Sequence, residues 1–198
     1  MLSKSDRTRQ HIITTSALLF NKKGYSGTSV SDITQAAKLT KGAVYSHFAN
    51  KDELARTCFD FNVQFIQNCV RKAEQIPGTA PEKLKALLNT YREIFPEVQK
   101  RGGCAIMNAT AEGGEHLPLL QAGIQKSIDV WKRSLERILR QGQIEGTILQ
   151  SIEVSGYATG IIAMVEGGIL LSKAYGNSEP FIAVMTRLDQ LFLTELYT

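Results

Sequence analysis

Hydrophobic positions recur every three to four residues along most of the chain, which is the spacing of amphipathic α-helices. Runs that alternate apolar and polar residues, as β-strands do, are nearly absent. Near the N-terminus, Ile13, Ala17 and Phe20 fall on one helical face, and Gly24 follows as the expected left-handed C-terminal cap. The pattern predicts an all-α protein.

Cap signals divide the first fifty residues into three helices. Ser29, with Asp32 three residues later, predicts a capping box at the start of a second helix of about two turns. Thr40 predicts the N-cap of a third helix, in which Val44 and Phe48 share the buried face. We therefore expect a three-helix domain in residues 1–50.

Caps, prolines and glycines bound further helices beyond this point, at about residues 51–74, 81–99, 104–116, 118–141 and 152–175, with a last helix capped near Ser178. They form a larger helical domain over residues 51–198, which brings the total to about nine helices. The segment 152–175 is apolar enough to raise the question of a membrane span. Glu166 in its middle and its many glycines favour a buried interface helix instead, so no membrane is expected.

Composition limits the class of protein. With 198 residues and 43% hydrophobic residues, the chain can bury a substantial core. Its first ten residues are polar and basic, unlike a signal peptide, which indicates a cytoplasmic protein. The three cysteines, Cys58, Cys69 and Cys104, are scattered, so we expect reduced thiols.

Charge is unevenly distributed. Residues 1–51 hold eight lysines and arginines against two aspartates, whereas the rest of the chain is slightly acidic. A polyanion would therefore meet the N-terminal end. Lys4, Arg7 and Arg9 form a basic N-terminal arm, for which solvated flexibility and groove contact both stay open.

The third helix divides its residues as a DNA-reading helix must, with one face packed inward and the other presented to base edges. Val44 and Phe48 face inward, which leaves Thr40, Lys41, Ala43, Tyr45 and His47 outward. Gly42 has no side chain to hold the helix away from DNA. Lys51 stands at the start of the next helix, where the helix dipole and the ammonium both attract a phosphate.

The segment TSVSDITQAAKLTKGAVYSHFANKDEL resembles the helix-turn-helix of the TetR family of bacterial transcriptional regulators. The similarity covers residues 9–54 and includes Tyr45, Phe48 and the run Lys51-Asp52-Glu53-Leu54. It implies a homodimer on a palindromic operator, with Lys41 and Ala43 at bases and Gly42 at the close approach. The positions that match phosphate contacts are Thr28, Thr40, Tyr45, His47 and Lys51.

The resemblance also implies a C-terminal helical domain that dimerises through its last two long helices and holds a small-molecule pocket. Gly156, Gly160, Ala163 and Gly167 fall on one face of the segment 152–175, where another helix could approach closely. The predicted interface residues are Gly156, Gly160, Ala163, Gly167, Val184, Leu188 and Leu191. Ordinary core packing is the simpler explanation for each candidate for binding the unknown effector. These candidates are Phe61, Phe65, Tyr91, Phe95, Cys104, Met107, Trp131 and Met164.

The segment GGCAIMNATAE resembles a branch of the same family in which Gly-Cys, an apolar stretch, Asn and Glu open the sixth helix next to the pocket. Some such members respond to electrophiles or oxidants through a cysteine. Cys104 stands at a helix N-terminus, whose dipole would lower a thiol pKa. A sensor role and a structural role for Cys104 both stay open.

An enzyme is the least favoured class, because no nucleophile motif, phosphate loop or metal-ligand spacing occurs. Glu112, Glu115 and His116 could be imagined as a metal or acid–base cluster, but a polar helix end explains them more simply. A helical interaction module without DNA binding is the other alternative. The sequence therefore predicts a DNA-binding repressor that needs no cofactor or metal and that leaves its operator when a small molecule binds or a cysteine is modified.

Overall fold

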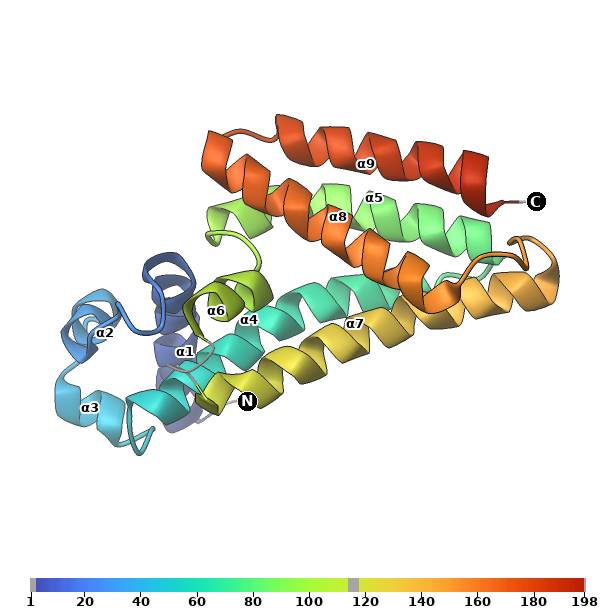
Figure 1. Cartoon of the computed structure of the whole chain (residues 1–198). Coiled ribbons are helices and arrows are strands. Elements are labelled where there is room, and N and C mark those ends of the chain that lie inside the picture. The colour runs from blue at the N-terminus through green and yellow to red at the C-terminus, as the bar shows by residue number, and fades with distance from the viewer. Residues whose placement is uncertain (1–2, 114–117, 198) are drawn as a thin grey trace. The chain divides into compact units, whose positions relative to one another are not determined.

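The computed structural model describes residues 3–113 and 118–197, and helices account for nearly all of its regular structure (Figure 1). The elements are α1 Lys4–Lys23, α2 Val30–Ala37, α3 Lys41–Tyr45, α4 Lys51–Glu74, α5 Ala80–Lys100, α6 Ala105–Gly113, α7 Pro118–Glu145, α8 Val154–Tyr175, α9 Glu179–Leu191 and the π-helical η2 Phe192–Leu196. Within those ranges the only β-type pairing is an isolated bridge between Ile148 and Tyr197. The all-α prediction is confirmed.

Helices α2 and α3 begin after the N-cap residues that the sequence predicted, Ser29 and Thr40. At α2 the Ser29 hydroxyl accepts from the Asp32 N–H at 3.1 Å, and the Asp32 carboxylate accepts from the Ser29 N–H at 2.8 Å. At α3 the Thr40 hydroxyl accepts from the Ala43 N–H at 3.2 Å. Gly24 ends α1, but with φ 88° and ψ 158° it is not the expected left-handed cap. A positive φ with extended ψ still favours glycine.

The basic N-terminal arm is helical rather than flexible. Ser3 and Asp6 form a capping box, so α1 begins at Lys4 and includes Arg7 and Arg9. The guanidinium carbon of Arg9 lies 4.8 Å from the centroid of the Phe48 ring, a cation–π distance. Of the two alternatives for the arm, flexibility does not fit, because the capping box stabilises the first turn.

Two later boundaries differ from the sequence prediction. Helix α7 continues through Gly142 to Glu145. A Cβ at Gly142 would lie 2.5 Å from Ile148 Cδ1 and 2.7 Å from Ala80 Cβ, so this glycine allows close packing instead of ending the helix. Helix α8 starts at Val154 because the Glu153 carboxylate accepts from the N–H groups of Ser155 and Gly156.

The chain divides into two compact units, each built from separate stretches. The first takes Met1–Phe65 and Arg101–Ser127, and the second takes Ile66–Lys100 and Ile128–Thr198. This division differs from a single boundary after residue 50, because α6 and parts of α4 and α7 belong to the same unit as the first three helices.

Aromatic stacking builds the core of the first unit. The rings of Phe20 and Tyr25 stack with centroids 5.2 Å apart, and Phe59 meets Tyr25 edge to face at 6.5 Å. Burial raises the pKa of the Tyr25 phenol well above its ordinary value. The side-chain amide of Asn62 donates to the carbonyl of Ala17 at 3.0 Å, which ties α4 to α1.

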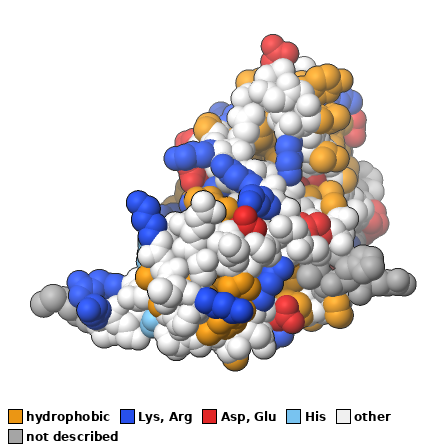
Figure 2. All heavy atoms as spheres, turned by 90° about the vertical axis from the view of Figure 1, so that its left-hand side faces the viewer, with side chains coloured by type: hydrophobic (Ala, Val, Ile, Leu, Met, Phe, Trp, Pro, Cys, Tyr) orange, Lys and Arg blue, Asp and Glu red, His pale blue; other side chains and the backbone are white. Residues whose placement is uncertain are grey.

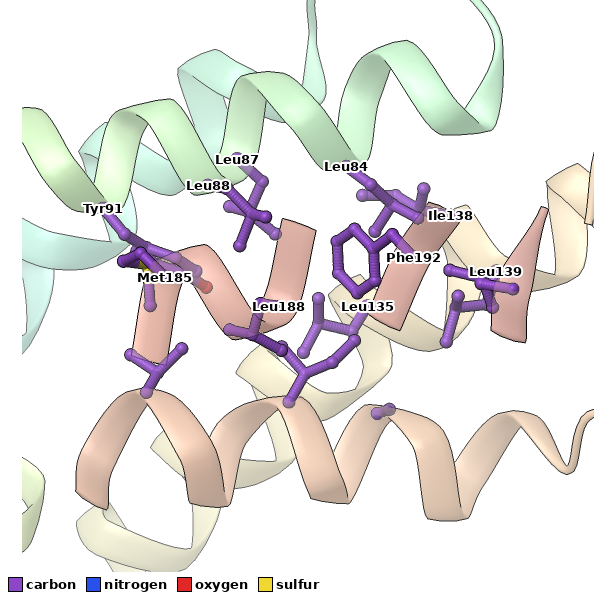
Figure 3. Close-up of a cluster of buried hydrophobic side chains, with 14 of the residues drawn as sticks. Leu84, Leu87, Leu88, Tyr91, Leu135, Ile138, Leu139, Met185, Leu188 and Phe192 are labelled. Carbon is purple, nitrogen blue, oxygen red and sulfur yellow. The ribbon is translucent and has the colours of Figure 1, made fainter. Parts of the chain in front are cut away.

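The core of the second unit is formed by α5, α7, α8 and α9 (Figure 3). Facing side chains from three of these helices and the start of η2 lie together in Figure 3: Leu84, Leu87, Leu88, Tyr91, Leu135, Ile138, Leu139, Met185, Leu188 and Phe192. Phe95 and Phe181 stack with ring centroids 3.9 Å apart. Each fully buried leucine stabilises the fold by about 1.5–3 kcal/mol relative to an exposed one.

Helix α8 is the one helix of the described residues that is long and apolar enough to cross a membrane. Ala158, Ile161 and Val165 of this helix are buried, because they pack into the core of the second unit. These contacts fit a core helix better than a membrane span.

Candidate nucleic-acid interface

Helix α3 presents the predicted division of its residues. Val44 and Phe48 are each 2% exposed and anchor the segment in the first unit. Lys41 and Gly42 are exposed, and Ala43 is half-buried beside them. Tyr45, His47 and Lys51 are also half-buried, so each keeps part of its side chain in solvent. A helix with this division can approach a DNA groove without losing its core contacts.

Gly42 is not required by the fold. A Cβ placed at Gly42 would meet no atom nearer than Thr40 Oγ1 at 4.0 Å, and the residue is not among those with positive φ. Alanine would favour the helix by about 1 kcal/mol over glycine at such a position. The missing side chain therefore leaves room for something outside the protomer.

Thr28 does not fit its predicted place as a phosphate contact. Its side chain is 0% exposed, and its hydroxyl donates to the carbonyl of Gly24 at 2.6 Å. The threonine closes the turn between α1 and α2. Its hydroxyl is therefore not available to a phosphate in this structure.

Polar contacts hold α1 and α2 together behind α3. Nε2 of His11 lies 2.9 Å from the carbonyl oxygen of Ala37, and the ammonium of Lys23 lies 2.6 Å from the carboxylate of Asp32. Hydrogen bonds from Lys23 and Ser29 lower the pKa of Asp32. These contacts fix the positions of α1 and α2 next to α3.

Lysine and arginine side chains stand out on the face that Figure 2 shows, which looks onto the end with α2 and α3. The exposed cations of this region include Lys4, Arg7, Lys22, Lys23, Lys38 and Lys41. The Lys41 ammonium lies 5.9 Å from the centroid of the Tyr45 ring, one helical turn along. A positive surface around an exposed helix is the footprint expected for a polyanion.

The predicted interface residues are only partly exposed. Gly156, Gly160 and Ala163 are exposed and Gly167 is half-buried. A Cβ at Gly160 or Gly167 would meet nothing within 4 Å. Leu188, in contrast, is 1% exposed and belongs to the protomer's own core. Val184 packs against Gly168, whose added Cβ would lie 3.2 Å from Val184 Cβ.

An apolar groove of about 210 Å³ runs between α8 and α9. Its lining residues are Gly156, Tyr157, Gly160, Ile161, Met164, Leu188, Leu191, Phe192 and Glu195. Large apolar side chains that sequence reasoning missed are exposed on the same two helices and just beyond them: Leu170, Leu171, Tyr175, Ile182 and Leu193. Their exposure could not be read from the sequence, because the spacing of apolar residues does not say which face a second helix covers.

The predicted effector residues fall into both units. Phe61, Phe65, Cys104 and Met107 belong to the first, and Tyr91, Phe95, Trp131 and Met164 belong to the second. In the second, the indole N–H of Trp131 donates to the Tyr91 hydroxyl at 2.6 Å, and burial raises the pKa of that phenol. Met164 lines the groove between α8 and α9. The eight candidates are therefore divided between the two units.

Cys58, Cys69 and Cys104 are thiols rather than halves of disulfides, as predicted. Cys104 is 3% exposed, and Cys58 donates to the carbonyl of Ile13 at 3.6 Å, with burial raising the pKa of the Cys58 thiol.

Over residues 3–113 and 118–197, no group of three or more potential ligands could hold a metal ion. Glu115 and His116 lie outside the described residues. Glu112 accepts from the backbone N–H groups of Tyr25 and Ser26, so it has a structural use.

Comparison with known proteins gives matches over most of the chain. Residues 12–58 match the family described as bacterial regulatory proteins, tetR family, and residues 80–188 match the tetracyclin repressor-like C-terminal domain. The HTH-type transcriptional repressor DhaR of Mycobacterium sp. strain GP1 is 27% identical over 189 residues, which cover 96% of this chain and 90% of DhaR.

Solved structures agree with these matches. A TetR transcriptional regulator from Chloroflexus aurantiacus superposes with a TM-score of 0.92 at 27% identity, and 99% of each chain is covered. A TetR-family regulator from Cytophaga hutchinsonii gives a TM-score of 0.85 at 34% identity, covering 98% of this chain and 96% of that one.

Proposed function

Because this chain belongs to the TetR family of DNA-binding transcriptional regulators, we propose that it is a cytoplasmic repressor that binds a palindromic operator as a homodimer. The observation that carries the proposal is the outer surface of α3, where Lys41, Gly42 and Ala43 stand above the buried Val44 and Phe48. The relatives are transcriptional regulators, and this chain is not an enzyme.

Base recognition falls to the start of α3. Lys41 donates to acceptor atoms of a purine edge, and the methyl group of Ala43 contacts a thymine methyl group. Gly42 lets the backbone approach between them. Thr40, Tyr45, His47 and Lys51 contact backbone phosphates, which fixes the register of the helix without reading sequence.

Dimerisation uses the outer face of α8 and α9. Gly160 and Gly167 have open space where a Cβ would stand, so a second α8 can approach closely there. The exposed Leu170, Leu171 and Ile182 add apolar surface that a monomer would leave in water. We place the interface on Gly156, Gly160, Ala163, Gly167 and Leu191, and we assign Val184 and Leu188 to packing within the protomer.

A small-molecule effector releases the protein from its operator by favouring a conformation whose two recognition helices no longer match the half-site spacing. Release through Cys104 is the second route. Because Cys104 is 3% exposed, an electrophile reaches its sulfur only when the start of α6 opens. Cys104→Ser should then prevent release by an electrophile such as N-ethylmaleimide. Release at the wild-type level by Cys104→Ser would remove this route.

The test of DNA binding is selection of bound duplexes from a random library by the purified protein, followed by a salt titration of the selected sequence. We expect a palindromic site with half-sites about one helical turn apart. The logarithm of the affinity should fall with the logarithm of the salt concentration, with a slope of about 0.9 per phosphate contact. Selection of no sequence above background would contradict the proposal and favour a helical interaction module.

A further inference from the structure

Two side chains of α6, Asn108 and Glu112, contact backbone groups of α1 and of the turn that follows it. They are four residues apart and therefore lie on one face of the helix. Glu112 accepts from the N–H of Tyr25 at 2.6 Å and from the N–H of Ser26 at 3.1 Å. Both N–H groups belong to the turn between α1 and α2, which precedes the recognition helix.

Asn108 makes the matching contact one turn earlier. Its amide nitrogen lies within 3.1 Å of three acceptors, namely the carbonyl and the side-chain oxygen of Asn21 and the carbonyl of Gly102. Asn21 is buried, and its own amide donates to the carbonyls of Arg101 and Gly103 at 2.8 and 2.9 Å. Asn21 and Asn108 thus join the last turn of α1 to the loop that opens α6.

Glycines allow this close approach. Gly102 has φ 95°, and a Cβ there would lie 2.9 Å from Lys22 Cγ and 3.2 Å from the carbonyl oxygen of Asn21. Gly24 has φ 88°, and an added Cβ would overlap the carboxylate of Glu112. Larger residues at these positions would separate α6 from the end of α1.

The network of Asn21, Asn108 and Glu112 has the character of a positioning device. Asn108 and Glu112 bond mainly to backbone groups of α1 and of the turn that follows it. The network therefore fixes the position of the backbone there. The buried Asn21 donates to two backbone carbonyls, those of Arg101 and Gly103. Its position is therefore restricted, because leaving a buried polar group unpaired costs about 1–3 kcal/mol. An apolar contact would tolerate sliding, whereas these bonds do not.

We infer that Asn108 and Glu112 are positioning residues for operator binding, which hold α1 and its following turn directly on α6. The inference rests on the proposed function and adds a contact route that does not pass through α4. A change at α6 is transmitted to the recognition helix through the turn that Glu112 holds. Asn108 and Glu112 of the segment GGCAIMNATAE therefore have a role in positioning α1 and the turn after it.

The test uses the operator that the wild-type protein selects, with the distance between its half-sites varied by one and two base pairs. Wild-type protein should prefer one spacing sharply. Glu112→Ala should bind that best site about tenfold more weakly and should discriminate less between spacings, since it loses two hydrogen bonds to a charged group. Asn108→Ala should act in the same direction.

Matched variants separate positioning from stability. Glu112→Gln keeps an oxygen that accepts from the same N–H groups and should retain the wild-type spacing preference. Thr110→Ala alters the exposed face of α6, where the hydroxyl donates to the carbonyl of Ile106 in the same helix, and should change nothing. Leu135→Ala, in the core of the second unit, should lower stability without changing the ratio of affinities between spacings.

Hydrogen exchange at Tyr25 and Ser26 gives a second measurement that does not depend on DNA. Glu112→Ala should speed exchange of these two amides, and Glu112→Gln should not. Wild-type spacing discrimination in Glu112→Ala and Asn108→Ala, or an equal drop in affinity at every spacing, would overturn the inference. If the wild-type protein itself selects no operator, the proposed function fails instead.

Discussion

The ammonium of Lys23, at the end of α1, lies 2.6 Å from the carboxylate of Asp32, which also closes the capping box at the start of α2. One carboxylate thus joins two helices of the DNA-binding region and satisfies the first turn of the second. Its pKa is lowered from the ordinary value of 3.8 by the hydrogen bonds from Lys23 and Ser29.

A lowered carboxyl pKa makes stability depend on pH at the acid end. The stabilisation from Asp32 is complete above its unfolded-state pKa, near 4, and is lost as the pH falls through the lower folded-state pKa. Asp32→Asn should therefore be less stable than wild type at pH 7, and the difference should shrink towards pH 2. Melting followed by circular dichroism from pH 7 to 2 measures this, and parallel profiles for the two proteins would argue against it.

Gly42→Ala should affect folding and DNA binding in opposite directions. The added methyl group meets no protein atom nearer than 4.0 Å, and alanine favours the helix, so the melting temperature should stay the same or rise. Operator affinity should fall, because the methyl group stands where DNA approaches. Fluorescence anisotropy with the selected operator checks this. Unchanged affinity in a stable Gly42→Ala protein would show that DNA does not approach at this position.

Lys41 and Lys51 should differ in the way they affect binding. Lys51→Ala should weaken binding to all sequences alike and reduce the salt slope by about 0.9 for each phosphate that the ammonium neutralises. Lys41→Ala should relax the preference at one base pair of each half-site by about 1–3 kcal/mol. Salt titrations and competition with single-base operator variants distinguish the two. Lys85→Ala, exposed on α5 in the second unit, is the control and should behave as wild type.

Gly160→Leu and Gly167→Leu should weaken the dimer while leaving the protomer folded. A Cβ at either position would meet no atom within 4 Å, so we expect the leucine to be tolerated within its own chain and to clash with a second one. Sedimentation velocity at several concentrations should detect monomer at concentrations where wild type is dimeric. Lys85→Leu adds an exposed leucine elsewhere and should stay dimeric. A dimer of wild-type strength in both glycine variants would place the interface on another surface.

Leu135→Ala should destabilise the second unit by about 2–5 kcal/mol, the range for creating a cavity at a fully buried leucine. Leu135 is 0% exposed and lies among side chains of α5 and α9 in Figure 3. Urea unfolding measures the decrease. Leu193→Ala, at a position that is 70% exposed in the protomer, is the matched control. A decrease below about 0.5 kcal/mol for Leu135→Ala would mean that the core tolerates the cavity.

Features set by neighbouring residues could be predicted from the sequence. The capping box of Ser29 and Asp32 and the Thr40 cap involve residues three positions apart, so the pattern contains all the information that they need. The outward placement of Lys41 and the inward placement of Val44 follow from helical periodicity in the same way. The resemblance to the TetR helix-turn-helix rests on such local features.

Features that depend on distant residues or on the path of a turn were missed. Thr28 was expected to meet a phosphate, but the turn between α1 and α2 buries it and its hydroxyl donates to the carbonyl of Gly24. The sequence pattern predicted that a helix ends before Gly142. In the structure Gly142 lies inside α7, and Ile148 and Ala80 from outside this helix pack against it. Asn21 and Asn108 are 87 positions apart, and no periodicity connects them. Each case depends on which segments meet after folding.

The division of the chain into interleaved stretches affects the order in which the protein can fold during synthesis. The first unit needs Arg101–Ser127 as well as its N-terminal part, and α5, which belongs to the second unit, lies between them. At about 5–20 residues per second, the ribosome makes the first three helices seconds before Asn108 and Glu112 emerge. The first three helices therefore lack their contacts with α6 until that later segment is made. A polypeptide that ends at residue 50 should be less ordered than the same residues within the whole chain.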